Sequence, residues 1–175
     1  MSLSPQATKW HLCTISFQDN DGEPEAPVWS SPEEADEQVL VTDGLQMHNL
    51  HKDIFYIADP SIAFIGVPYH VATFSLFEYQ AMAIAAVYSG KSTLPSQPEM
   101  RNEYNKKVKE KGVGRVFHSL KGEDVNYANE LISWINPGIV ASGGKAVEGH
   151  LEEWKAQYEA LRQAVTALGP RAKRP

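Results

Sequence analysis

The stretch DPSIAFIGVPYHVATFSLFEYQAMAIAAVYSGK, residues 59–91, decides the fold because it joins an apolar run, a Gly-Val-Pro turn and an apolar helix. The run SIAFIG, residues 61–66, is apolar throughout, which is typical of a central strand covered on both faces. Ser75 and Glu78 have the spacing of a capping box and Gly90 supplies a stop, so a helix is predicted between them. Apolar side chains surround its axis, and we therefore expect it to be buried in a larger assembly.

Shorter elements flank this stretch on both sides. β-Branched residues that end at a turn predict a strand at 39–44, and a second strand is predicted at 54–57. Helices are predicted at 98–111, which is strongly charged and expected on the surface, and at 124–135, which stops at Asn-Pro. The predicted fold class is α/β, with short strands followed by helices and a long C-terminal helix.

The two ends of the chain have weaker or simpler patterns. Residues 1–38 are acidic and rich in proline after a possible strand at 9–17, so we expect an irregular, partly disordered segment. A Gly-rich linker is predicted at 137–146 and an amphipathic helix at 147–169, followed by a basic tail at 170–175. The helix could dock on the body or pair with a second copy, and its short apolar stripe favours docking.

Composition limits the classes of function. The 175 residues carry a formal net charge of -6 and a pI near 5.5, which argues against a nucleic-acid partner. No apolar run approaches the roughly 20 residues of a spanning helix, and the first residues lack a secretory pattern. The single cysteine, Cys13, fits a reducing compartment. We expect a cytoplasmic protein without a membrane span.

Several catalytic motifs are incomplete. GVGRVF at 112–117 has phenylalanine where a dinucleotide fingerprint needs its third glycine, and SGKST at 89–93 leaves a helix instead of entering one. His48 and His51 are three apart without a second pair, so they are predicted to be a surface pair and no metal site is expected. The chain by itself contains no complete catalytic constellation.

The predicted strand, loop and helix of residues 61–90 together suggest one way to bind a ligand. Gly66 permits close approach of a ligand to the backbone, and free amides at 75–77 would present partial positive charge to an anion or a polarised carbonyl. An ordinary buried β-α unit is the alternative. Tyr69 and His70 lie in the same loop, where they face either the substrate side or solvent.

Residues 41–136 resemble the C-terminal part of the flavin-containing monooxygenases, particularly the fungal members. The resemblance rests on VTDG (41–44), on HNLHKDIFYIADPSIAFIGVPYHVATFSLFEYQAMAIAAVYSGKSTLPS (48–96) and on the Glu-Met-Arg sequence at the start of the charged helix. Within this stretch AFIG, LFEYQA and the GKSTLPS exit follow one another in the family's order and spacing. The family pattern Pro-Phe-Pro-Leu-Phe-Glu is altered here, because Thr73 and Ser75 replace the two prolines.

The resemblance implies a fold, cofactors and a site. Residues 39–136 would be the C-terminal part of a Rossmann-like FAD domain, in an oxidoreductase that uses FAD, NADPH and dioxygen to oxygenate soft nitrogen or sulfur nucleophiles. The helix start would face the pyrimidine edge of the flavin. The implied cofactor-binding residues are those of the turn and helix start: Gly66, Pro68, Phe74, Ser75, Leu76 and Phe77.

Both Gly-x-Gly-x-x-Gly fingerprints of the family are absent from this sequence. A helix start for the FAD pyrophosphate is therefore missing. We expect the chain to be the C-terminal portion of a monooxygenase that is inactive alone. The alternative is a noncatalytic truncated remnant or an interaction module, which would associate through an exposed apolar face or the C-terminal helix.

Overall fold

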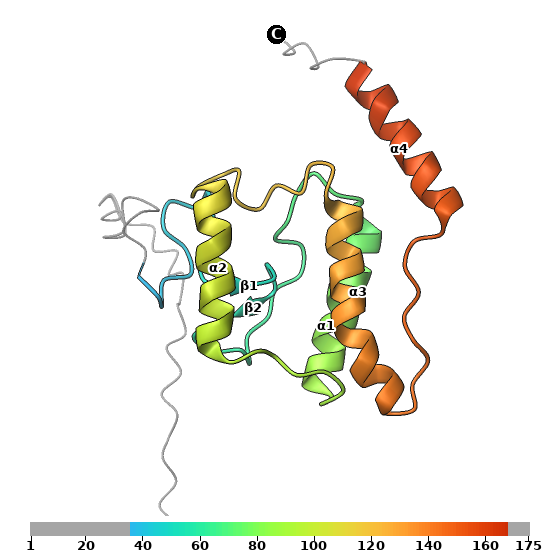
Figure 1. Ribbon diagram of the computed structural model, residues 1–175. Helices are drawn as coiled ribbons and strands as arrows, with labels where there is room; N and C mark the ends of the chain where they lie inside the picture. The colour runs from blue at the N-terminus through green and yellow to red at the C-terminus, as the bar shows by residue number, and fades with distance from the viewer. Residues whose placement is uncertain (1–35, 168–175) are drawn as a thin grey trace, which may run out of the picture.

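A short β-hairpin and three helices form the body of the computed structural model, which describes residues 36–167 (Figure 1). The elements follow the order β1 (Leu50–His51), β2 (Phe55–Tyr56), α1 (Thr73–Tyr88), α2 (Gln97–Lys111), α3 (Asp124–Ala141) and α4 (Glu152–Ala167). In Figure 1 the hairpin lies between α2 on one side and the α1–α3 pair on the other. The possible strand at 9–17, the basic tail at 170–175 and nearly all of the irregular segment 1–38 fall outside the described residues.

The two strands are antiparallel, with Leu50 opposite Tyr56 and His51 opposite Phe55. This hairpin confirms a strand within the predicted range 54–57. The prediction of a strand at 39–44 is wrong, because Val41 makes only an isolated bridge with Met47.

The prediction of a central strand at 61–66 is also wrong. Within this run Ala63 makes an isolated bridge with Phe55, while Ile62 and Ile65 are 41% and 49% exposed. A central strand needs a partner on each edge, and residues 36–167 contain only the two strands of the hairpin. The run therefore touches the hairpin on one edge, through the Tyr56 N–H to the Ile62 carbonyl at 3.0 Å and the Phe64 N–H to the Ile54 carbonyl at 2.9 Å, without becoming a central strand.

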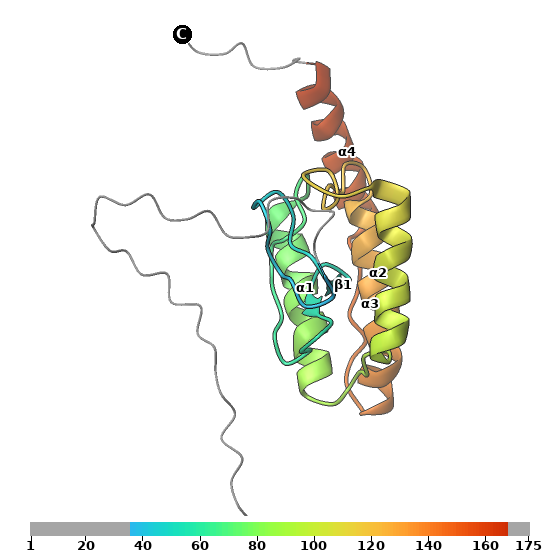
Figure 2. The ribbon, with the colours of Figure 1, turned by 90° about the vertical axis from the view of Figure 1, so that its left-hand side faces the viewer.

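Helices α1 and α3 lie side by side and enclose the main core with the hairpin (Figures 1 and 2). Small side chains on α1 allow the close approach, because Ala83 and Ala86 are both buried. The core cluster consists of Ile54, Phe55, Ala83, Ala86, Leu131 and Ile135. Within the described residues one face of α1 is covered, whereas Phe74 and Tyr88 are exposed.

Helix α2 covers the opposite side of the hairpin. Its start carries the capping pair that was predicted for α1, since the backbone N–H and the hydroxyl of Ser96 both donate to Glu99, at 2.9 and 2.7 Å. A second cluster of buried side chains lies under this helix: Ile57, Met100, Tyr104 and Phe117.

Helix α3 does not stop at Asn136-Pro137 as predicted, but continues through Pro137 to Ala141. Tertiary packing outweighs the cost of the proline here. Gly138 lies so close to the chain at Lys91 that an added Cβ would be 1.6 Å from the Lys91 carbonyl oxygen. The indole of Trp134 donates to the Thr93 carbonyl at 3.3 Å. The connection to the last helix therefore starts at residue 142, not 137.

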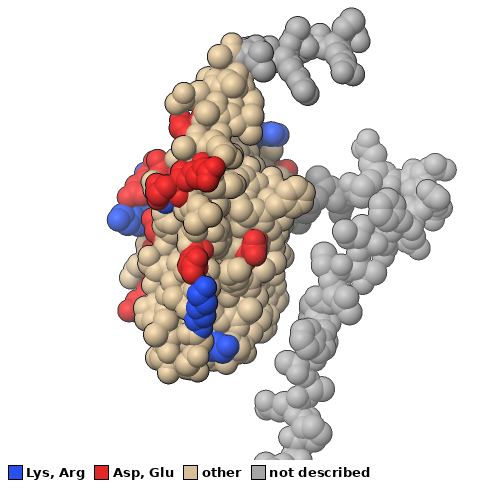
Figure 3. Space-filling model, turned by 90° about the vertical axis from the view of Figure 1, so that its right-hand side faces the viewer, with Lys and Arg blue, Asp and Glu red and all other residues tan. Residues whose placement is uncertain are grey.

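Helix α4 extends away from the body (Figures 1 and 3) and begins at Glu152, five residues after the predicted start at 147. Trp154 and Tyr158 are half-buried, whereas Leu151, Leu161 and Val165 of the same stripe are 71%, 60% and 59% exposed. The His150 and Trp154 rings stack at 3.8 Å, and Tyr79 of α1 meets His150 edge-on at 4.9 Å. The helix thus docks through its first half only. None of the helices in residues 36–167 has the length and apolar character needed to cross a membrane.

Candidate functional site

The turn at Gly66 is fixed against α1 by two contacts. Gly66 has a φ of +86°, which side-chain-bearing residues rarely adopt, and an added Cβ would lie 2.8 Å from Cζ of the Phe77 ring. Its backbone N–H donates to Oε1 of Gln80 at 2.9 Å. The structure thus requires glycine here because of the backbone conformation and the ring beside it. The close approach of a ligand to Gly66 stays a prediction.

Helix α1 begins at Thr73 with Ala72 at its N-cap, three residues before the predicted cap at Ser75. Ser75 is not the cap, because its hydroxyl donates back to the Ala72 carbonyl at 3.1 Å. The Leu76 N–H already donates to the same carbonyl at 3.0 Å. The predicted free amides at 75–77 are therefore wrong for 76 and 77, and the first-turn amides that precede the helical hydrogen-bond ladder belong to residues 73–75.

One carboxylate already lies at this helix start. Oδ2 of Asp124, the first residue of α3, accepts hydrogen bonds from the Ala72 N–H at 3.1 Å and from the Tyr158 hydroxyl at 2.7 Å. Its Oδ1 is buried without a partner among the described residues. Burial, together with the hydrogen bond to Asp124, raises the pKa of Tyr158 to about 12. Asp124 thus joins the start of α1 to α4.

The predicted site residues have different environments. Phe74 is 90% exposed at the helix start, whereas the Leu76 side chain is buried and Pro68 is buried in the loop. Gly66 and Phe77 are in direct contact, and Ser75 is half-buried. The structure therefore brings Gly66 and Phe77 together, leaves Phe74 open and places the Leu76 side chain in the core. Their part in binding a cofactor stays a prediction.

Gly66 also lines a surface depression of about 460 Å³, together with Gln46, Arg115 and His118. Tyr69 and His70 are fixed toward the 112–123 loop. The Tyr69 hydroxyl donates to the Arg115 carbonyl at 2.7 Å, and Nδ1 of His70 lies 3.1 Å from the Ser119 hydroxyl.

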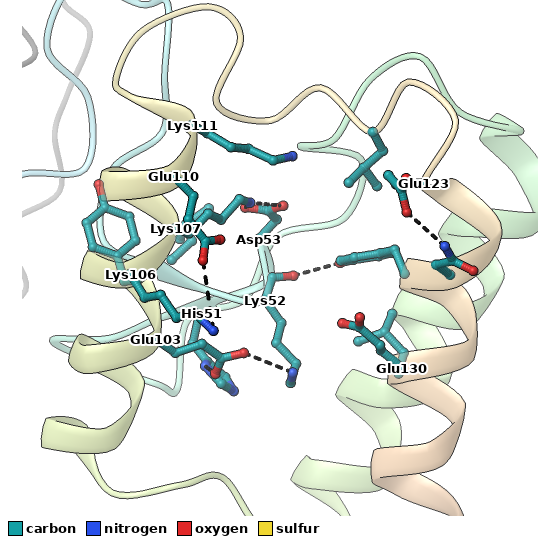
Figure 4. A pocket seen from close by; sticks show the side chains of 16 residues that line it. His51, Lys52, Asp53, Glu103, Lys106, Lys107, Glu110, Lys111, Glu123 and Glu130 are labelled. Carbon is teal, nitrogen blue, oxygen red and sulfur yellow. Dashed lines mark hydrogen bonds and ion pairs between the residues drawn. The ribbon is translucent and has the colours of Figure 1, made fainter.

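A second concave region lies between α2 and α3 and is lined by charged side chains from both helices and from the hairpin (Figure 4). Asp53, at the hairpin turn, accepts from Lys107 with both oxygens at 2.6 Å and lies 3.0 Å from Nδ1 of His118. Burial opposes ionisation of Asp53, but the hydrogen bond from His118 and the charge of Lys107 outweigh it and hold its pKa below the usual range. Helix α2, whose charges predict a position on the surface, thus also supplies one partner of a buried ion pair.

The prediction that His48 and His51 form a surface pair is wrong, because both are buried. Nε2 of His48 lies 3.0 Å from the Thr42 hydroxyl. Nδ1 of His51 lies 3.0 Å from Glu103, and this close contact lowers the Glu103 pKa to about 2. Local spacing gave no signal for the contact of His51 with Glu103, because α2 supplies this partner from about fifty residues away. Among residues 36–167, no group of three or more His, Cys, Asp or Glu side chains is arranged to hold a metal ion.

Comparisons with known proteins point to one kind of enzyme, although no family model matches the chain. The flavin-containing monooxygenase ustF2 of Aspergillus flavus is 47% identical over 135 residues, which is 77% of this chain and 27% of that relative. For ustF1 of the same fungus the identity is 48% over 146 residues, 83% of this chain and 36% of that relative. The solved structure of S-allyl-L-cysteine S-oxygenase from Allium sativum matches with a TM-score of 0.59 and 25% identity, over 74% of this chain and 28% of that one. The chain thus spans about a third or less of the length of these proteins.

Proposed function

Because the chain is the C-terminal portion of a flavin-containing monooxygenase of the fungal type, we propose that residues 39–136 complete a Rossmann-like FAD domain. In this proposal the chain supplies the turn and the helix start that face the flavin. The observation that carries it is the geometry at α1, where the first-turn amides of residues 73–75 precede the helical ladder near the Gly66 turn.

The residues present fit the carbonyl edge of a flavin better than a phosphate. Three backbone N–H groups at a helix start suit an acceptor with partial negative charge. A fully charged phosphate would be repelled by Asp124, whose carboxylate lies at the same helix start. The exposed Phe74 ring at the helix start is available to cover an aromatic cofactor. The buried Leu76 anchors the first turn, so that the amides keep their direction.

When bound, FAD reduced by NADPH would supply the oxygen-activating chemistry of the complete protein. The chain's own residues would position the ring and stabilise charge at its carbonyl edge. No Gly-x-Gly-x-x-Gly fingerprint occurs in the sequence, so the pyrophosphate of FAD and the NADPH would be bound by the part that the relatives have in addition. We therefore expect this chain alone to be inactive.

The substrate class proposed for the complete protein is a small molecule with a soft nitrogen or sulfur nucleophile. The similar solved structure is that of an S-oxygenase, which supports a sulfur substrate. The proposal needs no general base from this chain, because the cofactor carries the oxygen transfer.

A second candidate function is that of a noncatalytic remnant or interaction module. Large apolar side chains favour it, because they are exposed over several elements: Ile62, Ile65, Phe74, Val116 and Val140. The same exposure is expected if the remainder of a monooxygenase packs there, so it supports both candidates.

A graft separates the two. The 135-residue matching segment of ustF2 would be replaced by that of this chain, and the purified chimera tested for bound flavin and for NADPH-dependent oxygenation of a thioether. We expect a flavin-loaded, active chimera. A folded chimera that binds no flavin would refute the monooxygenase proposal and favour the interaction module.

A further inference from the structure

Gln80 of α1 is a polar residue at a position where helix neighbours are apolar. Its side chain is 0% exposed, and the other buried residues of the helix are Leu76, Ala83 and Ala86. A buried amide destabilises a core unless its donors and acceptor are paired. An apolar side chain of the same size would fill this space without the free-energy cost of removing an amide from water. The paired amide therefore points to a role beyond packing.

The orientation of the Gln80 amide is fixed by its two partners. The Gly66 N–H can only donate, so it must face Oε1, at 2.9 Å. The Tyr127 hydroxyl donates its proton to the Lys52 carbonyl at 2.6 Å, so its oxygen must accept from Nε2 of Gln80, at 3.0 Å. Burial raises the pKa of Tyr127 far above its usual value, so the hydroxyl keeps the proton for this chain of hydrogen bonds.

These bonds connect three parts of the fold. The hydrogen-bonded chain starts at the Gly66 turn, passes through α1 and α3, and ends at the hairpin carbonyl of Lys52. Figures 1 and 2 show α1 and α3 side by side, and the hydrogen bonds of Gln80 link this helix pair to the turn. Gln80 follows Phe77 by three residues, so both side chains project from the same face of the helix. The Phe77 ring lies beside Gly66, and the Gln80 amide accepts the hydrogen bond from the Gly66 N–H.

We propose that Gln80 is a positioning residue, which fixes the Gly66 turn over the Phe77 ring and so sets the surface on which the flavin lies. The flavin part of this inference rests on the proposed function. The positioning part does not, because the hydrogen bond to Gly66 can be measured in the chain without a cofactor.

The chain offers a matched control. Gln46 is 3% exposed and has the same arrangement, because its Oε1 accepts from the Gly114 N–H at 2.7 Å and its Nε2 donates to the Tyr104 hydroxyl at 3.2 Å. Gln80→Met and Gln46→Met remove the same groups from two buried sites. A difference between the two variants in the exchange rates of the Gly66 and Gly114 amides shows which glycine each glutamine holds.

The test is amide hydrogen exchange, followed by NMR on the ¹⁵N-labelled chain. In Gln80→Met we expect exchange at Gly66 to accelerate about tenfold or more while Gly114 is unchanged, and in Gln46→Met the reverse. Gln80→Glu keeps an acceptor for Gly66 and should restore most of its protection. Should Gln80→Met not fold, Tyr127→Phe, which removes only the hydroxyl, must still accelerate exchange at Gly66 more than at Gly114.

Equal acceleration at both glycines, or unchanged exchange at Gly66, would overturn the positioning role. The flavin part is read separately in the ustF2 chimera, where Gln80→Met should lower flavin affinity at least tenfold and Gln46→Met should not. If the exchange pattern is found and the unsubstituted chimera binds no flavin, the proposed function fails while the positioning of Gly66 stands.

Discussion

Replacement of Gly66 by alanine tests the geometry of the candidate site. The substitution acts through two separate causes. A left-handed backbone costs a residue with a Cβ about 1–2 kcal/mol, and Gly66 has a φ of +86°. The new Cβ would also lie 2.8 Å from Cζ and 2.9 Å from Cε1 of Phe77, and overpacking of this kind costs about 1–3 kcal/mol. Because the Phe77 ring is only half-buried and can shift, we expect a total loss of about 2–4 kcal/mol.

Gly44 provides the control for the backbone cause. It has a φ of +80°, and an added Cβ would meet nothing within 4 Å, so Gly44→Ala should cost only about 1–2 kcal/mol. Urea unfolding followed by circular dichroism gives both free energies of unfolding. Phe77→Leu in the Gly66→Ala background should recover part of the difference. Equal losses for Gly66→Ala and Gly44→Ala would refute the contact between the turn and the ring.

Three further predictions concern the polar contacts around the site. Lys107→Met leaves the Asp53 carboxylate, which is 2% exposed, without its cationic partner, and should lower the free energy of urea unfolding by about 3 kcal/mol. Glu103→Gln should cost only about 1 kcal/mol at pH 7, because the carboxylate is 51% exposed and screened. Since the folded-state pKa of Glu103 lies below its unfolded value, at about 2, this cost should shrink as the pH falls from 4.5 toward 2. Tyr158→Phe should speed hydrogen exchange in α4 about fivefold without changing global unfolding, because one hydrogen bond to the body is lost.

Each of these has a comparison that can contradict it. Lys106→Met removes a lysine that is 76% exposed, and a loss equal to that of Lys107→Met would show that the buried pair is not formed. A Glu103→Gln cost that stays constant down to pH 2 would contradict the lowered pKa. Unchanged exchange in α4 of Tyr158→Phe would show that the stacked Trp154 and His150 rings hold the helix without the hydroxyl.

The sequence predicts helices well here because their signals are local. The helix at 98–111 ends at its glycine as expected, and α1 ends at Tyr88, just before the predicted stop at Gly90. The start of α1 was misplaced because Ser75 and Glu78 match a capping box by spacing, whereas the same signal at Ser96 and Glu99 is satisfied in the structure. Spacing alone does not tell which of two such pairs forms the cap.

Predictions that depend on distant partners failed for a different reason. An apolar run such as 61–66 is typical of a central strand, but such a strand needs a neighbour on each edge, and among the described residues only β2 bridges to this run. The burial of His51 depends on α2, and that of Gln80 on Tyr127 of α3. The glycine at 66 was predictable because a turn after an apolar run demands it, whereas the amide that holds this turn was visible only in three dimensions.

The most direct test of the central claim is chemical-shift mapping of the ¹⁵N-labelled chain during titration with FAD. The account predicts weak binding, with the largest shifts at Gly66 and at the amides of residues 73–75, because these groups face the flavin while the pyrophosphate lacks its fingerprint. Shifts confined to the charged groove between α2 and α3, or no shifts at millimolar FAD, would contradict the claim that this part of the chain is built for the flavin.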